Sequence, residues 1–205
     1  MKLYYYPGAC SLAAHIVARE AGLPIALEKV DLHAGTTETG ANFKAINPKG
    51  YVPALGLQDG SVLTEAGAII QYLADHQPGN DLAPAAGTME RYRLLEWITF
   101  ISTEIHKGFG PLWNPAASDD VKTATKQRLA TRFALLDETL GKQPYLMGQA
   151  FTIADAYLFT VTNWANFHNV DLSPFPNLQA FQARIAARPK VQEALEAEGL
   201  LKKAA

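Results

Sequence analysis

The sequence predicts a small α/β domain followed by a domain made only of helices. Three observations support this prediction. Short strand-like and helix-like segments alternate over about the first eighty residues, a stretch with two prolines and two glycines follows at residues 77–87, and only helical hydrophobic periods are found from residue 88 onward. We therefore expect residues 1–78 to form the first domain and residues 88–205 to form the second.

Turn residues separate the elements of the first domain. Pro7 and Gly8 end an aromatic strand, and Asp59 and Gly60 lie between two short strands, which is a strong signal for a β-hairpin. Residues 35–40 show no clear period. The expected elements, in order, are a strand at 3–6, a helix at 12–21, a strand at 25–30, strands at 51–55 and 62–63, and a helix at 65–76.

In the second domain, apolar residues recur at helical spacing. One stripe runs along residues 94–112 and another along 129–140, while residues 153–167 are apolar nearly all round, as in a buried helix. Thr152 and Asp155 form a capping box at the start of that helix, which we interpret as structural. Shorter helices are expected around residues 178–185 and after Arg188.

The composition excludes several classes of protein. Apolar residues make up 48% of the 205 residues and the formal net charge is −2, so we expect neither a disordered chain nor one that binds nucleic acid. Polar residues interrupt the longest apolar stretch, at 156–170, and neither a signal peptide nor a membrane segment is predicted. Cys10 is the single cysteine and cannot form an internal disulfide, which favours a reducing cytoplasm.

Cys10 is the first candidate for chemistry. It lies at the expected start of a helix, where unpaired N–H groups and the positive end of the helix dipole stabilise a thiolate. We therefore expect the pKa of the Cys10 thiol to be lowered and its reactivity to be raised. Ser11 offers a second polar group beside it. The alternative interpretation is a small, buried and inert side chain.

The bond between Val52 and Pro53 is the second candidate feature. A cis bond there would turn the chain and leave the backbone N–H and C=O groups of Val52 to pair with an extended peptide. The alternative is a trans proline on an edge strand, which is the commoner state of any X-Pro bond.

Thr64, Glu65 and Ala66 lie at the expected N-terminus of the third helix. Thr64 is the expected N-cap, and the carboxylate of Glu65 in the first turn suits the helix dipole. This structural interpretation would suffice alone. The functional one adds that Glu65 could hold the ammonium group of a ligand beside amides that hold its carboxylate.

Thr99, Thr103, His106 and Gly110 are spaced by four, three and four residues, so a regular helix would place them on one face. Trp113 extends that face, which could line a cleft. The near-neutral pKa of histidine suits proton transfer, although a lone histidine on a helix is more often a packed or surface residue. The other histidines show no metal-ligand spacing, so no metal is predicted.

Together these motifs resemble the glutathione transferases, and the resemblance covers essentially the whole chain. The order of elements is similar to their thioredoxin-like domain, residues 47–53 to their cis-proline loop, residues 63–69 to their γ-glutamyl-binding turn and residues 152–155 to their capping box. Residues 5–11 around Cys10 and residues 100–109 around His106 are similar to the bacterial beta class.

The resemblance implies a fold and an activity. The fold would be a thioredoxin-like α/β N-terminal domain plus an all-α C-terminal domain, with glutathione as co-substrate and no metal. The enzyme would be a cytoplasmic homodimer, without a nucleic-acid or membrane partner, that conjugates glutathione with small hydrophobic electrophiles in detoxification. Thiol-transferase or peroxidase activity on oxidised substrates would accompany conjugation.

The resemblance also implies roles for particular residues. Cys10 and His106 would be catalytic, Val52 would pair with the backbone of the glutathione cysteine, and Glu65 would hold the γ-glutamyl end. From the helical domain, His106 and Lys107 would close the cleft, and Thr103 and Glu104 would reach glutathione across a dimer interface. The implied glutathione contacts are Ser11, Tyr51, Val52, Pro53, Glu65, Ala66, Thr99, Thr103, Glu104 and Lys107.

Several alternatives stay open at this point. Related transferases use a tyrosine or a serine near the same turn, so the group that activates the thiol could instead be Tyr4, Tyr5, Tyr6 or Ser11. Gly35, Ala66 and Thr99 stand where the family often has Lys, Ser and Asn. The chain could also be a specialised glutathione-dependent dehalogenase, or a non-catalytic glutathione- or ligand-binding stress protein.

Overall fold

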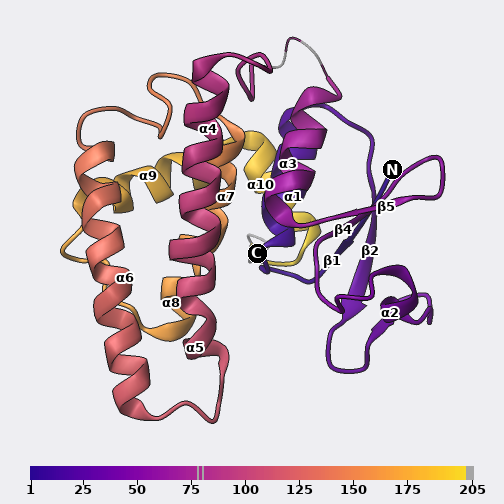
Figure 1. Cartoon of the computed structure of the whole chain (residues 1–205), viewed down its shortest axis with the longest axis horizontal. Helices are drawn as coiled ribbons and strands as arrows, with labels where there is room; N and C mark the ends of the chain where they lie inside the picture. Colours follow the sequence, from indigo (N-terminus) through magenta and orange to yellow (C-terminus); the bar gives the residue numbers. More distant parts are fainter. Residues whose placement is uncertain (78, 80, 202–205) are drawn as a thin grey trace. The chain divides into compact units, whose positions relative to one another are not determined.

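A computed structural model describes residues 1–77, 79 and 81–201 (Figure 1). By its internal contacts the chain divides into two compact units. Unit 1 comprises Met1–Ala83 and the chain from Ala187 onward, and unit 2 comprises Pro84–Ala186. The segment from Ala187 onward thus groups with the α/β unit, whereas the sequence pattern assigned it to the helical domain. Residue 78, the end of the first expected domain, lies outside the described residues, and so do residues 202–205 at the end of the second.

Unit 1 is built on a five-stranded mixed sheet with the strand order β3-β2-β1-β4-β5. β1 pairs in parallel with β2 and antiparallel with β4, and the expected hairpin of β4 and β5 is confirmed. β3 lies in residues 35–40, the stretch that shows no clear period in the sequence. A strand of two residues is too short to produce such a period. The strands are β1 (Lys2–Tyr5), β2 (Ala26–Asp31), β3 (Thr36–Thr37), β4 (Ala54–Gly56) and β5 (Val62–Thr64).

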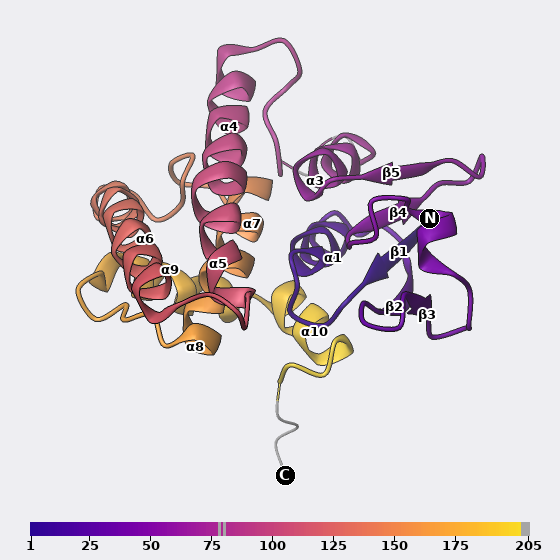
Figure 2. The same ribbon diagram turned by 60° about the horizontal axis from the view of Figure 1, so that its bottom comes forward.

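Helices pack on both faces of this sheet. They are α1 (Ser11–Glu20), α2 (Phe43–Ile46), α3 (Ala66–Asp75) and α10 (Pro189–Ala197). α1 and α3 lie side by side in both views (Figures 1 and 2), and α10 packs against α1. Because side chains alternate along a strand, Leu3 and Tyr5 of β1 are buried on the face toward α1, while the Tyr4 ring lies 5.9 Å from that of Phe43 in α2.

Ion pairs and apolar contacts fix α10 to α1. The guanidinium of Arg188 forms two hydrogen bonds with the carboxylate of Glu20, at 2.7 and 2.9 Å. Val191, Ala194 and Leu195 form the buried stripe of α10. This packing explains why the chain from Ala187 onward groups with unit 1.

Unit 2 is built from helices around α7. They are α4 (Met89–Phe100), α5 (Gly110–Trp113), α6 (Asp119–Leu140), α7 (Ile153–Thr162), α8 (Trp164–His168) and α9 (Pro176–Ala186). α7 is buried along its whole length and packs against α4 and α9, and α6 packs against α9. In the described part of the chain, no helix is both long enough and apolar enough to cross a membrane.

The helix expected at residues 153–167 is broken into α7 and α8 at Asn163, so that prediction is wrong in its extent. Thr162, the last residue of α7, donates its hydroxyl to the Leu158 carbonyl at 2.6 Å. Such bonds from a threonine to the preceding turn often bend a helix. Apolar periodicity continues through the break, which is why the sequence pattern did not reveal it.

The capping box at the start of α7 is confirmed. One oxygen of Asp155 accepts the backbone amide of Thr152 at 2.8 Å and its hydroxyl at 2.9 Å, and the other oxygen accepts the Leu146 amide at 2.8 Å. Burial raises the pKa of the Asp155 carboxyl to about 6, although these hydrogen bonds act in the opposite direction. The carboxyl therefore anchors the loop before α7 to the helix.

Candidate active site

Cys10 lies where the sequence predicts, after β1 and a tight turn and immediately before α1. The Ala9 amide closes the turn by donating to the Tyr6 carbonyl at 3.0 Å, and Gly8 has a φ of 72°, which glycine adopts without strain. Cys10 is the N-cap residue of α1 and is only 8% exposed. Its thiol therefore lies at the positive end of the helix dipole.

The competitors of Cys10 around this turn have other partners. The Ser11 hydroxyl is fully buried; it accepts the Tyr6 amide and donates to the Tyr6 carbonyl, both at 3.2 Å, and so braces the turn. Burial, followed by the nearby charge of Glu198, raises the pKa of Tyr5 and disfavours its phenolate. A role for Ser11 in glutathione binding stays a prediction.

The bond between Val52 and Pro53 is cis, as the resemblance predicts. The thiol of Cys10 donates to the Val52 carbonyl, with the sulfur 3.3 Å from the oxygen. The expectation that this carbonyl would be left open is therefore wrong, because the Cys10 side chain extends from the start of α1 to this loop. The Val52 N–H makes no hydrogen bond to any residue that the structure describes.

Asn47 shapes the loop that leads to Val52. Its side chain is buried, accepting the Lys49 amide at 3.1 Å and donating to the Tyr51 carbonyl at 2.7 Å. Gly50 completes the turn with a φ of 75°. Tyr51 and Pro53, both predicted glutathione contacts, thus flank Val52 on a loop with a fixed backbone, and the Tyr51 side chain is 47% exposed.

The start of α3 differs in detail from the expectation. Thr64 is the last residue of β5 and not the N-cap, because it pairs with Ala54 in the hairpin. Glu65 is the N-cap residue, with φ 72° and ψ 122°, a conformation that is rare for a side chain of this size and that clusters at functional sites. Among the described residues, the N–H groups of Ala66 and Gly67 have no partner.

From the loop that leads to Val52, Lys49 reaches the carboxylate of Glu65, the residue predicted to hold the ammonium group of a ligand. Its ammonium nitrogen lies 2.6 Å from Oε1 of Glu65 and 3.0 Å from the hydroxyl of Thr64. Both side chains are about half exposed, and the bond to Glu65 raises the pKa of Lys49. Cys10, Val52, Glu65 and the open amides of α3 thus all belong to unit 1.

His106 lies in unit 2, in a segment that is not a regular α-helix. A π-helical segment, η1 (Ile101–His106), follows α4, and a 3-10 turn, η2 (Lys107–Phe109), leads into α5. A π-helix adds a residue to the turn, so the spacing of Thr99, Thr103, His106 and Gly110 no longer places them on one face. His106 is half-buried, whereas the other three are exposed.

The His106 imidazole is held by two aromatic residues. Its Nδ1 lies 2.6 Å from the hydroxyl of Tyr157, which is 1% exposed, and its ring meets the Trp164 ring edge-on at 5.0 Å. Trp113, which the sequence pattern placed on the same face as His106, contacts Trp164 and His168. The π-helical segment thus places the imidazole against α7 and α8.

The remaining predicted contacts of unit 2 lie in and around η1. The Thr103 hydroxyl donates to the Thr99 carbonyl at 3.0 Å, and Glu104 pairs with Arg132 of α6 at 2.7 Å. Lys107 is exposed at the start of η2. Glu104 is therefore engaged within its own unit, and its reach across a dimer interface stays a prediction.

Several supporting residues carry no local signal in the sequence. Asn47 and Lys49 are exceptions, because they lie inside the loop of residues 47–53, and that motif is the signal that could have identified them as site residues. Tyr157, however, lies 51 positions from His106, and Glu198 lies 183 positions from His15, its partner at 2.9 Å. Only the folded chain brings these pairs together.

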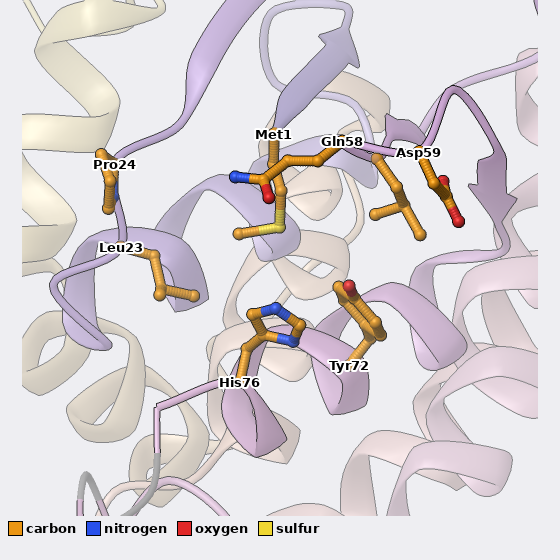
Figure 3. A pocket seen from close by; sticks show the side chains of 8 residues that line it. Met1, Leu23, Pro24, Gln58, Asp59, Tyr72 and His76 are labelled. Carbon is orange, nitrogen blue, oxygen red and sulfur yellow. The ribbon is translucent and has the colours of Figure 1, made fainter.

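A separate hollow of about 420 Å³ lies at the other end of β1 from Cys10 (Figure 3). Its walls are Met1, Leu23, Pro24, Leu57, Gln58, Asp59, Tyr72 and His76, and none of these is a predicted site residue. Within residues 1–77, 79 and 81–201, no group of three or more His, Cys, Asp or Glu side chains could hold a metal ion.

The fold and the Cys10 site define a thioredoxin-like protein with an added helical unit. The family model "Glutathione S-transferase, N-terminal domain" matches residues 8–76, and "Glutathione S-transferase, C-terminal domain" matches residues 100–189. The chain is 47% identical to the glutathione S-transferase GstA of Escherichia coli O157:H7, over 98% of this chain and all of that one. It therefore belongs to the glutathione S-transferase family, and it is a glutathione transferase.

Solved structures agree with this assignment. The bacterial transferase BphK, in a ternary complex, is 54% identical with a TM-score of 0.96, over 98% of this chain and 100% of that chain. A sphingomonad transferase in complex with glutathione and a beta-class transferase of Sphingomonas chungbukensis are 45% and 46% identical, both with a TM-score of 0.95 and the same coverage. The resemblance to the bacterial beta class is thereby confirmed.

Proposed function

We propose that this transferase holds glutathione with its thiol beside Cys10, and that it exchanges disulfides as well as conjugating glutathione. The supporting observation is the 3.3 Å contact between the Cys10 sulfur and the Val52 carbonyl. A peptide that pairs with the open N–H of Val52 brings its own cysteine next to that sulfur. When the bound glutathione is part of a disulfide, its sulfur lies beside the Cys10 thiolate, and a thiolate beside a disulfide sulfur is the reactant pair of thiol–disulfide exchange.

The exchange cycle balances with glutathione as the reductant. The Cys10 thiolate attacks the glutathione sulfur of a mixed disulfide between glutathione and a small thiol, a bond forms between the two sulfurs, and the small thiol leaves as its thiolate. A glutathione thiolate then attacks the disulfide on Cys10, which releases oxidised glutathione and regenerates Cys10. Conjugation uses the same glutathione thiolate as the nucleophile on a carbon electrophile.

The rest of glutathione is proposed to bind as the family resemblance implies. Glu65 takes the ammonium group of the γ-glutamyl end and the Ala66 amide takes its carboxylate. Ser11, Tyr51 and Pro53 line the peptide. From unit 2, His106 is proposed to act on the glutathione thiol, and the further contacts are Thr99, Thr103, Glu104 and Lys107.

The second substrate, the assembly and the location are also proposals. Small hydrophobic electrophiles suit a detoxifying conjugation enzyme, and the named transferases among the relatives support that class. A homodimer and a cytoplasmic location are proposed on the same basis. The single cysteine is compatible with a reducing compartment.

Intact mass spectrometry tests the role of Cys10 directly. The chain has one cysteine, so incubation with oxidised glutathione under mild conditions should add the mass of one glutathione to the wild type and nothing to Cys10→Ser. Retention on immobilised glutathione and turnover of a general aryl halide should accompany it. Normal turnover with no adduct would refute the redox role and leave conjugation standing.

A further inference from the structure

We propose that Lys49 reads the α-carboxylate of the γ-glutamyl end, so that Lys49 and Glu65 together select a zwitterionic amino-acid head group. This inference rests on the proposed function, in which Glu65 receives the ammonium group of glutathione. It adds a specificity residue that lies in a different loop from Glu65.

The backbone of Lys49 is fixed before its side chain meets Glu65. The buried amide of Asn47 accepts the Lys49 N–H at 3.1 Å, and Gly50 turns the chain directly after it. The side chain then spans to the junction of β5 and α3, where Nζ contacts Oε1 of Glu65 at 2.6 Å. Lys49 is thus directed at the head-group region by a defined turn.

The pair is poorly explained as a stabilising surface ion pair. Both side chains are about half exposed, at 46% for Lys49 and 56% for Glu65. Exposed pairs of this kind typically contribute about 0.2–1 kcal/mol to folding. Glu65 meanwhile keeps a backbone conformation that is unfavourable for a non-glycine residue. Local stability alone therefore gives little reason for the arrangement.

A bound α-amino acid would complete an alternating arrangement of charges. Oε1 of Glu65 is occupied by Lys49, whereas Oε2 makes no hydrogen bond within the described residues. When the ammonium group of an α-amino acid binds Oε2, the carboxylate on the same carbon meets the open amides of Ala66 and Gly67. Lys49 is the nearby cation that this carboxylate can approach, so each positive group has negative neighbours.

A lone cation as ligand would not gain from this arrangement. It would face Glu65 but would also meet the like charge of Lys49 at close range, without a carboxylate to separate them. A lone carboxylate would gain Lys49 and the amides but would meet the like charge of Glu65. The site therefore favours both charges on one carbon, as in the γ-glutamyl group.

Calorimetric titration with three peptides tests this role. The peptides are glutathione, an analogue in which 4-aminobutanoyl replaces γ-glutamyl and so lacks the α-carboxylate, and a glutaryl analogue that lacks the ammonium group. Lys49→Met should weaken binding of glutathione by roughly 3- to 20-fold and should not weaken binding of the aminobutanoyl analogue. Lys44→Met is the matched control, because Lys44 is an exposed lysine near Gly50 that forms no ion pair with any described residue.

Each other outcome has a definite meaning. Tighter glutathione binding by Lys49→Met would overturn the proposal, because Lys49 would then be a competitor for Glu65. Equal binding by Lys49→Met and Lys44→Met would also overturn it and leave Lys49 as a surface residue. If the wild type bound none of the peptides, the proposed glutathione site would fail as well. Binding of glutathione by the wild type therefore separates a failure of the Lys49 proposal from a failure of the proposed function.

Discussion

The imidazole of His15 and the carboxylate of Glu198 lie 2.9 Å apart, and both side chains are fully buried. Nε2 of His15 accepts the Nε–H of Arg19 at 3.2 Å, so a neutral imidazole carries its proton on Nδ1 and donates it to Glu198. The second oxygen of Glu198 accepts the Gly8 amide at 3.0 Å. The segment after α10 is therefore bonded to the turn that precedes Cys10.

We expect Glu198→Ala to lower the free energy of unfolding by about 3 kcal/mol, because it removes the carboxylate that accepts from the buried His15 and from the half-buried Gly8 amide. Urea denaturation measures this value. Glu196→Ala is the control, because Glu196 is exposed in the last turn of α10 and should change stability by less than about 0.5 kcal/mol. Equal stability of the two variants would show that the buried bonds contribute nothing measurable.

Asp155 gives an expected pH dependence of stability. Its folded-state pKa is raised by burial to about 6, so between pH 3.8 and 6 the folded state binds more protons than the unfolded state. Stability that depends on this group therefore rises as the pH falls through that window, and declines as the pH rises through it. Across the whole window, the contribution of Asp155 to the free energy of unfolding changes by on the order of 3 kcal/mol.

Asp155→Asn removes this titration while keeping the size of the side chain. We expect the gap in unfolding free energy between wild type and variant to widen in favour of the wild type as the pH falls from 7 to 4. Denaturation at a series of pH values provides the measurement. A gap that stays constant over the series would mean that Asp155 titrates at its ordinary pKa in the folded chain.

The fold follows from the sequence wherever a period persists over several turns or a turn has special residues. The Asp59 and Gly60 hairpin and the stripe of α6 are such cases. The break at Asn163 and the π-helical segment before His106 are not, because both keep the apolar spacing on either side. Small deviations in backbone hydrogen bonding leave no mark on hydrophobic periodicity.

The candidate site follows from the sequence one residue at a time. Cys10 and Glu65 can be predicted as candidate site residues because each lies at the expected start of a helix. Their partners do not, because Cys10 meets Val52 at a separation of 42 positions, and no local rule fixes such a contact. The Thr64 cap failed for a related reason: pairing in the β-hairpin extended the strand to Thr64 and moved the cap to Glu65.

The proposed homodimer can be tested through α4. Met89 and Tyr92 are one turn apart on this helix and are 65% and 58% exposed, so they form an exposed apolar pair on one face. We expect the wild type to have a dimer mass in light scattering at micromolar concentration, and Tyr92→Glu to shift it toward the monomer. Val121→Glu, at an exposed apolar position of α6, should leave the mass unchanged.

A monomeric wild type at that concentration would refute the homodimer. The proposed contacts of Thr103 and Glu104 across an interface would fall with it. A dimer that Tyr92→Glu does not affect would keep the assembly and exclude this face of α4 from it.

His106 and Tyr157 form a hydrogen-bonded pair in unit 2. The proposed role of His106 on the glutathione thiol needs an imidazole with a fixed orientation, and the bond of 2.6 Å to the buried Tyr157 hydroxyl supplies one. The interaction grows as the thiolate forms, so its loss should lower turnover more than glutathione affinity. His106→Ala should reduce kcat by about 10² or more, within the usual range for acid–base groups.

Tyr157→Phe separates orientation from bulk packing, because it removes the hydroxyl and keeps the ring. We expect it to lower kcat by roughly 3- to 10-fold and to shift the pH dependence of kcat, since the imidazole loses a hydrogen-bond partner that distinguishes its two nitrogens. His168→Ala is the control, because His168 is a second aromatic-packed histidine of unit 2 and not a proposed site residue. If His106→Ala turned over every substrate as fast as His168→Ala, His106 would be a packing residue against Trp164 and Tyr157. Activation of the thiol would then rest with Cys10, Ser11 or a tyrosine at positions 4–6, and Cys10→Ser would show whether Cys10 is the group that acts.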